Sequence, residues 1–206
     1  MEIANQKGGG GKTTTIFNLD VGLARAGKKV LLIDCDPQGD LTICCGYPNN
    51  DDIDITRTTV MERVIADKDI PPDFGIIHQA KGVDLLPANI ELSDLELRIV
   101  SATCRERMLS TYIEQVKHKY DYVLIDCMPS LGVITIGAFA VADSIIIPVQ
   151  AHYLLLKGMP QLTKNIGKIQ RQINPKLKID GIVLTLVAEN TILAKTTEQM
   201  SAPLIK

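Results

Sequence analysis

Four short apolar runs constrain the fold of this 206-residue chain more than any other feature. Each run is rich in branched side chains and is bounded by turn residues, which is typical of strands buried on both faces of a parallel sheet. Amphipathic stretches separate the runs, so we expect an α/β fold in one domain over residues 1–206, with a mostly parallel twisted sheet and helices on both faces. The expected strands are Val30–Ile33, Tyr122–Ile125, Ser144–Ile147 and Ile182–Thr185.

The segments between the runs predict helices. The first should extend from Thr13 to Ala26, because Gly27 stands where helices commonly end. Only three residues separate Met1 from Asn5, so the first strand is expected to be short. An exposed acidic loop is expected over 47–52, and further helices over 60–66, 93–117, 133–141 and 156–172.

Charge and composition limit the class of protein. The chain has 22 basic and 24 acidic residues, so binding to DNA would need a local basic patch. It has no apolar run of about eighteen residues and no signal-peptide pattern, so we expect a cytoplasmic protein with no membrane partner. Its five cysteines include no CxxC pair, which disfavours a disulfide framework or a zinc site.

A glycine-rich segment, KGGGGKTT, lies between the first strand and the first helix, where a phosphate-binding loop belongs. Glycines let backbone N–H groups turn toward phosphate oxygens, and the helix N-terminus adds its dipole. Lys12 would reach the β- and γ-phosphates, and the Thr13 hydroxyl would bind Mg²⁺. A flexible turn beside a helix cap is the alternative. The predicted nucleotide-binding residues are Lys7, Gly8, Gly9, Gly10, Gly11, Lys12, Thr13 and Thr14.

The usual motif, GxxxxGK(S/T), is incomplete, because Gln6 occupies the place of its first glycine. The variant present, KGGxGK(S/T), resembles the deviant Walker A motif of the ParA/MinD ATPases, which have a P-loop NTPase-like fold. The resemblance implies ATP and Mg²⁺ as cofactors and an ATP-dependent homodimer. It also implies that Lys7 crosses the dimer to touch the partner's phosphates, so that Lys7 and Lys12 are both catalytic.

Two aspartate segments follow predicted strands, at the sheet edge where ligands bind in α/β proteins. Asp34–Asp40 (DCDPQGD) resembles the switch I segment of ParA-type partition ATPases, DxDPQGN, which implies that Asp36 orients the attacking water. Asp126–Gly132 (DCMPSLG) resembles their Walker B and switch II segment, DxPPSLG. The alternative for either aspartate is a strand-end cap or a turn residue. The predicted metal-binding residues are Thr13, Asp36 and Asp126.

The resemblance covers nearly the whole chain. The DPQG and PSLG segments favour the partition branch over the MinD branch, and relative to the family the chain is expected to be short at both ends. The family implies a weak ATP hydrolase of chromosome or plasmid partition, in which ATP closes a dimer that binds DNA without sequence preference. A ParB-like centromere-binding partner then stimulates hydrolysis, and association with the nucleoid follows from the DNA binding.

A basic stripe lies between Asp143 and Asp180, a stretch without any acidic residue. It could hold DNA phosphates without sequence preference, or it could be a solvated helix face that aids solubility. Family members often have a DNA-contacting arginine at the place of Asn190. The basic residues are Lys157, Lys164, Lys168, Arg171, Lys176 and Lys178, of which all but Lys157 are our candidate DNA contacts.

Two other functions remain open on the sequence alone. Gly10 at the family's usual valine position, Met128 in switch II and Asp40 in switch I motivate a degenerate homologue that binds nucleotide or a partner without cycling. An electron-transferring iron protein of the same superfamily would share a cluster between subunits through two cysteines. Cys104 and Cys127 lack the flanking glycines expected for that role.

Overall fold

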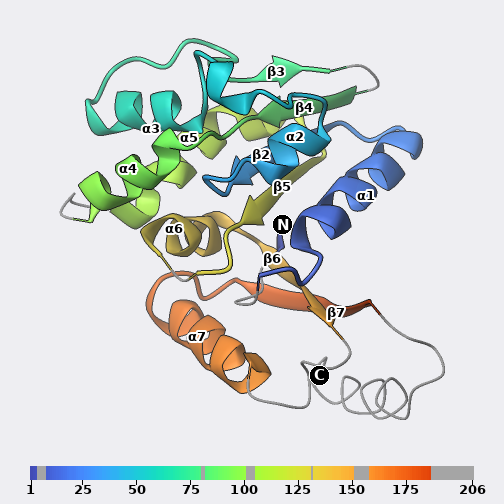
Figure 1. Ribbon diagram of the computed structural model, residues 1–206. Helices are drawn as coiled ribbons and strands as arrows, with labels where there is room; N and C mark the ends of the chain where they lie inside the picture. Colours follow the sequence, from blue (N-terminus) through green and yellow to red (C-terminus); the bar gives the residue numbers. More distant parts are fainter. Residues whose placement is uncertain (4–7, 80–81, 101–104, 131, 151–157, 187–206) are drawn as a thin grey trace.

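The computed structural model describes residues 1–3, 8–79, 82–100, 105–130, 132–150 and 158–186. Within these ranges the centre of the molecule is a seven-stranded sheet with the order β3-β4-β2-β5-β1-β6-β7 (Figure 1). All neighbouring strands are parallel except β3 and β4. The predicted α/β fold is therefore confirmed. The strands are β1 (Glu2–Ile3), β2 (Val30–Cys35), β3 (Ile77–His78), β4 (Val83–Leu86), β5 (Tyr122–Cys127), β6 (Ser144–Gln150) and β7 (Lys178–Thr185).

Helices cover both faces of the sheet (Figure 1). One face carries α1 (Lys12–Arg25) and α2 (Asp40–Cys44). In the part of the chain that is described, no helix is long and apolar enough to cross a membrane. The opposite face carries α3 (Arg57–Ile65), α4 (Glu91–Ile99), α5 (Met108–Val116), α6 (Val133–Val141) and α7 (Gly158–Gln172).

The prediction of one helix over 93–117 is wrong. α4 ends at Ile99, and a 3₁₀ turn at Arg105–Arg107 leads into α5, while residues 101–104 lie outside the described ranges. A straight helix of that length would extend about 37 Å. By folding back instead, the chain buries Leu95 of α4 and Tyr112 of α5 in the same apolar cluster.

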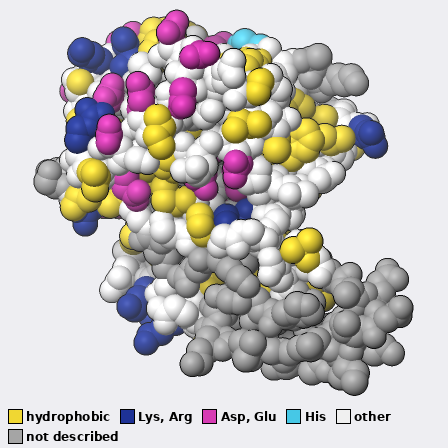
Figure 2. Space-filling model, in the orientation of Figure 1, with side chains coloured by type: hydrophobic (Ala, Val, Ile, Leu, Met, Phe, Trp, Pro, Cys, Tyr) yellow, Lys and Arg dark blue, Asp and Glu magenta, His cyan; other side chains and the backbone are white. Residues whose placement is uncertain are grey.

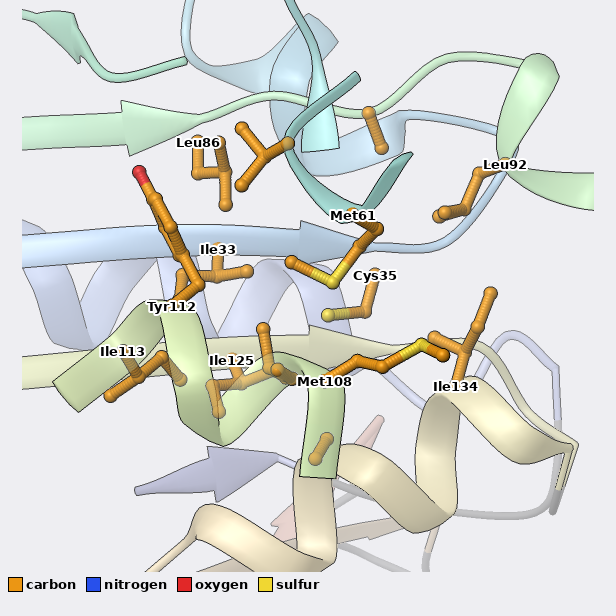
Figure 3. Close-up of a cluster of buried hydrophobic side chains, with 14 of the residues drawn as sticks. Ile33, Cys35, Met61, Leu86, Leu92, Met108, Tyr112, Ile113, Ile125 and Ile134 are labelled. Atoms are coloured by element: carbon orange, nitrogen blue, oxygen red, sulfur yellow. The ribbon is translucent and has the colours of Figure 1, made fainter. Parts of the chain in front are cut away.

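Alternate residues of the central strands supply the core on either side of the sheet. Ile33 and Cys35 pack with Tyr112 on the α5 side (Figure 3), whereas Leu32 packs with Ile16 on the α1 side. β2 is buried throughout, as predicted. The same expectation is wrong for β7, which is partly exposed along its length, because it is the edge strand of the described sheet.

Asp20 is a buried carboxylate on α1 that makes the stability of the protein depend on pH. Its side chain is 2% exposed, and its Oδ1 has no hydrogen-bond partner among the residues described. Burial raises the pKa of Asp20 from 3.8 to about 6. Because the folded state then binds the proton more tightly than the unfolded state, stability falls as pH rises from about 4 to about 6.

We predict that the Asp20→Asn variant is more stable than wild type by about 1–3 kcal/mol at pH 8, and that most of this difference disappears at pH 4.5, where Asp20 of the wild type is protonated in the folded state. Guanidinium denaturation at the two pH values measures the difference. Exposed Asp69→Asn is the control and should show little effect at either pH. An equal Asp20→Asn effect at both pH values would contradict the titration of a buried carboxylate.

Candidate functional site

A cavity of about 870 Å³ opens at the carboxyl ends of β1, β2 and β5. The glycine-rich loop and the start of α1 form one wall, and the segments that follow β2 and β5 and the end of β7 form the others. This is the place where α/β sheets bind their ligands. The cavity is lined by residues 8–15, Asn18, Asp36, Gln38, Asp40, Pro129, Val183, Thr185 and Leu186. It therefore brings together most of the residues predicted to bind nucleotide, while Lys7 lies outside the described ranges.

The glycine-rich loop adopts a conformation that needs glycine. Gly9 and Gly11 have φ values of +70° and +80°, a region that residues with a Cβ rarely occupy. Gly11 precedes the first residue of α1, Lys12, whose side chain is only 7% exposed although it is charged. The loop thus delivers a buried lysine and a helix N-terminus to the cavity, which favours an anionic ligand.

Thr13 and Asp126 form the polar centre of the site. The Thr13 hydroxyl donates a 2.6 Å hydrogen bond to Asp126 Oδ2, and Asp126 is 1% exposed at the end of β5. Burial raises the pKa of Asp126 to about 7, against the lowering effect of Thr13 and Lys12. The second carboxylate oxygen, Oδ1, is buried without a hydrogen-bond partner among the described residues.

This arrangement fits Mg²⁺. An unpartnered carboxylate oxygen beside a hydroxyl suits a cation that takes only one or two protein ligands and completes its shell with water and phosphate. Within the described ranges, no group of three or more His, Cys, Asp or Glu side chains forms an all-protein metal site. Thr13 and Asp126 are therefore the residues whose geometry fits the metal, and Asp36 stays a predicted ligand.

Asp34 anchors the loop that carries Asp36. The Asp34 side chain is fully buried and accepts hydrogen bonds from the backbone N–H groups of Asp36 (3.1 Å) and Thr42 (2.9 Å). The Thr42 hydroxyl also donates to Asp34 (2.7 Å). Burial raises the pKa of Asp34 to about 6. Asp36 itself is half-buried, lines the cavity and accepts a 3.0 Å hydrogen bond from the Gln38 N–H.

The expected exposed loop over 47–52 is wrong at Asn50, which is 8% exposed. Its amide donates a 3.2 Å hydrogen bond to the carbonyl of Ala88, after β4. Gly39, with a φ of +65°, packs directly on this pair, and a Cβ there would lie 2.9 Å from the Ala88 carbonyl oxygen. Asn50 is thus buried because it joins switch I to the neighbouring strand end.

The segment that resembles switch II, Asp126–Gly132, contacts α4. Pro129 lines the cavity, and Gly132 stands at the N-terminus of α6. A Cβ on Gly132 would collide with the carboxylate of Glu96 in α4. Leu131 lies outside the described ranges. Switch II therefore connects the cavity to a helix that packs against α3 and α6.

The basic residues of α7 lie on its outer face. Leu162, Ile166 and Ile169 are buried against the sheet, and Lys and Arg side chains gather over the other side of the helix (Figure 2). Lys157 and Asn190 lie outside the described ranges. The exposed candidate residues are Lys164, Lys168 and Arg171 on α7 and Lys176 and Lys178 after it.

Cys127 does not fit an intersubunit cluster. Its thiol is 1% exposed and lies in the core with Cys35, its register partner on β2. Both are free cysteines, and Cys104 lies outside the described ranges. The described part of the chain thus gives the iron-protein alternative no support.

Four residues that shape the cavity were not predicted from the sequence. Asp34 and Thr42 hold switch I, and Asp34 belongs to the DCDPQGD segment, which could have indicated it. Gln150 and Thr185 donate hydrogen bonds to the carbonyls of Gly9 and Gly10, respectively. Thr185 is the last residue of a predicted strand, whereas Gln150 lies three residues after the predicted strand Ser144–Ile147, because β6 extends to Gln150.

Comparison with known proteins agrees with this geometry. The AAA_31 family model, described as an AAA domain, matches residues 1–179. An uncharacterized protein of Mycobacterium tuberculosis is 40% identical over 191 residues, which are 92% of this chain but only 58% of that protein. The sporulation initiation inhibitor protein Soj of Bacillus subtilis is 41% identical over 92% of this chain and 73% of its own length. The chromosome partitioning protein ParA of Caulobacter vibrioides is 38% identical over 90% of this chain and 68% of its own.

Solved structures share the fold. Cobyrinic acid a,c-diamide synthase from Mycobacterium smegmatis, solved with bound ADP and magnesium, superposes with a TM-score of 0.88 at 34% identity, covering 98% of this chain and 80% of that one. A plasmid partition protein of Borrelia burgdorferi bound to AMPPNP gives a TM-score of 0.79 at 27% identity, covering 97% and 78%. The chain therefore belongs to the ParA-type partition ATPases of the ParA/MinD superfamily.

Proposed function

We propose that the protein is a ParA-like ATPase that binds and hydrolyses MgATP in the cavity beside the glycine-rich loop. The observation that carries this proposal is the Thr13–Asp126 hydrogen bond, because it leaves one buried carboxylate oxygen free next to a phosphate-binding loop. The nucleotides and magnesium bound to its solved relatives support the same ligand. The proposal includes dimerisation on ATP and a role in chromosome or plasmid partitioning.

The residues divide the chemistry among themselves. Backbone N–H groups of the loop and the N-terminus of α1 bind the phosphates, and Lys12 neutralises charge on them. Thr13 and Asp126 hold Mg²⁺, which when bound offsets charge on the β- and γ-phosphate oxygens. Asp36 accepts a hydrogen bond from the attacking water and takes its proton. Lys7, from the partner subunit, adds a second cation at the γ-phosphate.

Calorimetry with MgATP and MgADP, phosphate release and light scattering test the proposal on the wild-type chain. We expect both nucleotides to bind, slow turnover of MgATP, and dimers with MgATP but not with MgADP. A degenerate homologue that does not cycle would bind nucleotide without turnover or dimerisation. A chain that binds neither nucleotide would contradict the ATPase and would leave only a homologue that binds a partner.

The proposed DNA surface is the outer face of α7, and a ParB-like protein is the proposed partner. We predict that the double variant Lys168→Ala/Arg171→Ala binds duplex DNA more weakly than wild type. The fall of log affinity with log salt concentration should also become less steep by about 2, because each lost phosphate contact reduces the steepness by about 0.9. Anisotropy titrations with MgATP, MgADP or no nucleotide, on two DNA sequences, measure the slope.

The matched control for this surface is Lys28→Ala, an exposed lysine that follows α1 and lies outside α7. It should leave the slope unchanged. Equal weakening on both DNA sequences is expected, because phosphate contacts carry no sequence information. A double variant with the wild-type slope would show that α7 is only a solvated face.

A further inference from the structure

Two strands from the second half of the chain end against the glycine-rich loop. Gln150 is the last residue of β6, Thr185 is the last residue of β7, and the two are register partners. Gln150 Nε2 donates a 2.7 Å hydrogen bond to the carbonyl of Gly9. Thr185 Oγ1 donates a 3.0 Å hydrogen bond to the carbonyl of Gly10. Adjacent side chains on one sheet edge therefore hold consecutive peptide groups of the loop.

Each of these bonds also fixes an N–H group. A trans peptide is planar, so its N–H points opposite to its C=O. The carbonyl of Gly9 shares its peptide plane with the N–H of Gly10, and the carbonyl of Gly10 shares its plane with the N–H of Gly11. Gln150 and Thr185 therefore orient the N–H groups of Gly10 and Gly11 away from β6 and β7.

The loop needs this external support because its own sequence specifies little. Four consecutive glycines allow many backbone conformations, and ordering them costs more entropy than ordering other residues. Thr185 also lies close to Gly11, because a Cβ built on Gly11 would lie only 3.2 Å from the Thr185 methyl carbon. The end of β7 thus packs on the loop and binds it at the same point.

We propose that Gln150 and Thr185 are positioning residues that preset the N–H groups of the phosphate loop, an inference that rests on the proposed nucleotide site. Because they hold the loop in its binding conformation, less conformational entropy is lost when phosphate binds. The affinities for MgATP and for MgADP should therefore depend on these two residues to the same degree. The turnover rate at saturating MgATP should change much less than the affinity.

Thr185 offers a matched pair of variants. Thr185→Val keeps the shape and the methyl contact but removes the O–H donor, whereas Thr185→Ser keeps the donor. Valine favours strands, and Thr185 is the last residue of β7, where serine removes only a methyl group; we therefore expect both variants to fold. Thr185→Val should raise the Kd of MgATP and of MgADP by about 3–10-fold, the effect of one lost neutral hydrogen bond, and Thr185→Ser should stay within about 2-fold of wild type. Adding Gln150→Met to Thr185→Val should weaken both nucleotides further.

Hydrogen exchange of the nucleotide-free protein tests the same idea without any ligand. Short labelling times should show faster exchange of the amides at 8–12 in Thr185→Val than in wild type or Thr185→Ser, with unchanged exchange in α5. Equal exchange and equal Kd values in all three proteins would overturn the inference. If wild type binds neither nucleotide, the proposed function fails, while faster loop exchange in Thr185→Val would still support the anchoring of the loop.

Discussion

Replacing Lys12 by alanine is expected to lower the rate of MgATP hydrolysis by at least about 100-fold and to weaken nucleotide binding. Lys12 is the first residue of α1 and is almost fully buried at the wall of the cavity. Its charge also lowers the pKa of Asp126, which burial otherwise raises. The substitution therefore removes a cation from the phosphates and makes the neighbouring carboxylate harder to ionise.

The second effect gives the prediction a pH signature. Without Lys12 the pKa of Asp126 rises above its value of about 7, so a smaller fraction of the carboxylate is ionised at neutral pH. Residual MgATP binding by Lys12→Ala should therefore improve more steeply between pH 6.5 and 8.5 than binding by wild type. Isothermal titration at several pH values and steady-state phosphate release measure the two effects.

Lys28→Ala, a loss of charge at an exposed position just after the same helix, is the control and should hydrolyse MgATP at the wild-type rate. Circular dichroism will show whether Lys12→Ala folds. A folded Lys12→Ala protein that retains a third or more of the wild-type turnover would contradict the placement of the γ-phosphate beside this residue.

The central part of the fold was predictable because it depends on local signals. β2 and β5 are continuous apolar runs, and Gly27 ends α1 in a positive-φ conformation as expected. The edge of the sheet formed by β3 was not predictable. β3 has two residues, and it is held by the Asp84 carboxylate, which lies 2.9 Å from His78 Nδ1 and accepts a 2.6 Å bond from the Tyr120 hydroxyl. Such pairing leaves no periodic trace in the sequence.

The same distinction applies to the site. The glycine-rich loop and the strand-end aspartates are contiguous motifs, so their residue types and order indicate phosphate chemistry. The side chains that hold the loop are distant: Gln150 is 141 positions from Gly9, and Thr185 is 175 positions from Gly10. Glutamine and threonine at the ends of strands are common and carry no pattern of their own. Predicting their contacts with the loop would have required the register of β6 against β7, which places Gln150 beside Thr185.

Asp36→Ala is expected to lower the turnover of MgATP by about 100-fold or more, while the Kd of MgATP stays within about 3-fold of wild type because Thr13 and Asp126 hold the metal. The reason is that the carboxylates of Asp34 and Asp36 have different roles. Asp34 accepts three hydrogen bonds, one from the Asp36 N–H and two buried ones from Thr42, so it still holds both ends of the loop when Asp36→Ala removes the bond from the Gln38 N–H. The Asp36 carboxylate, whose Oδ1 accepts the Gln38 N–H, lines the cavity and can act on water there. A larger rise in Kd would instead identify Asp36 as a Mg²⁺ ligand.

Asp40→Asn is the control for Asp36, because Asp40 is an exposed acid of the same segment that also lines the cavity. Removing its charge should change turnover by less than about 3-fold, whereas loss of a general base costs about 100-fold or more. Single-turnover phosphate release separates chemistry from product release. The residue after Asp126 is Cys127, and a cysteine side chain cannot act as a second carboxylate base. If Asp36→Ala turned over MgATP at the wild-type rate while Lys12→Ala did not, the proton would have to go to a group other than Asp36.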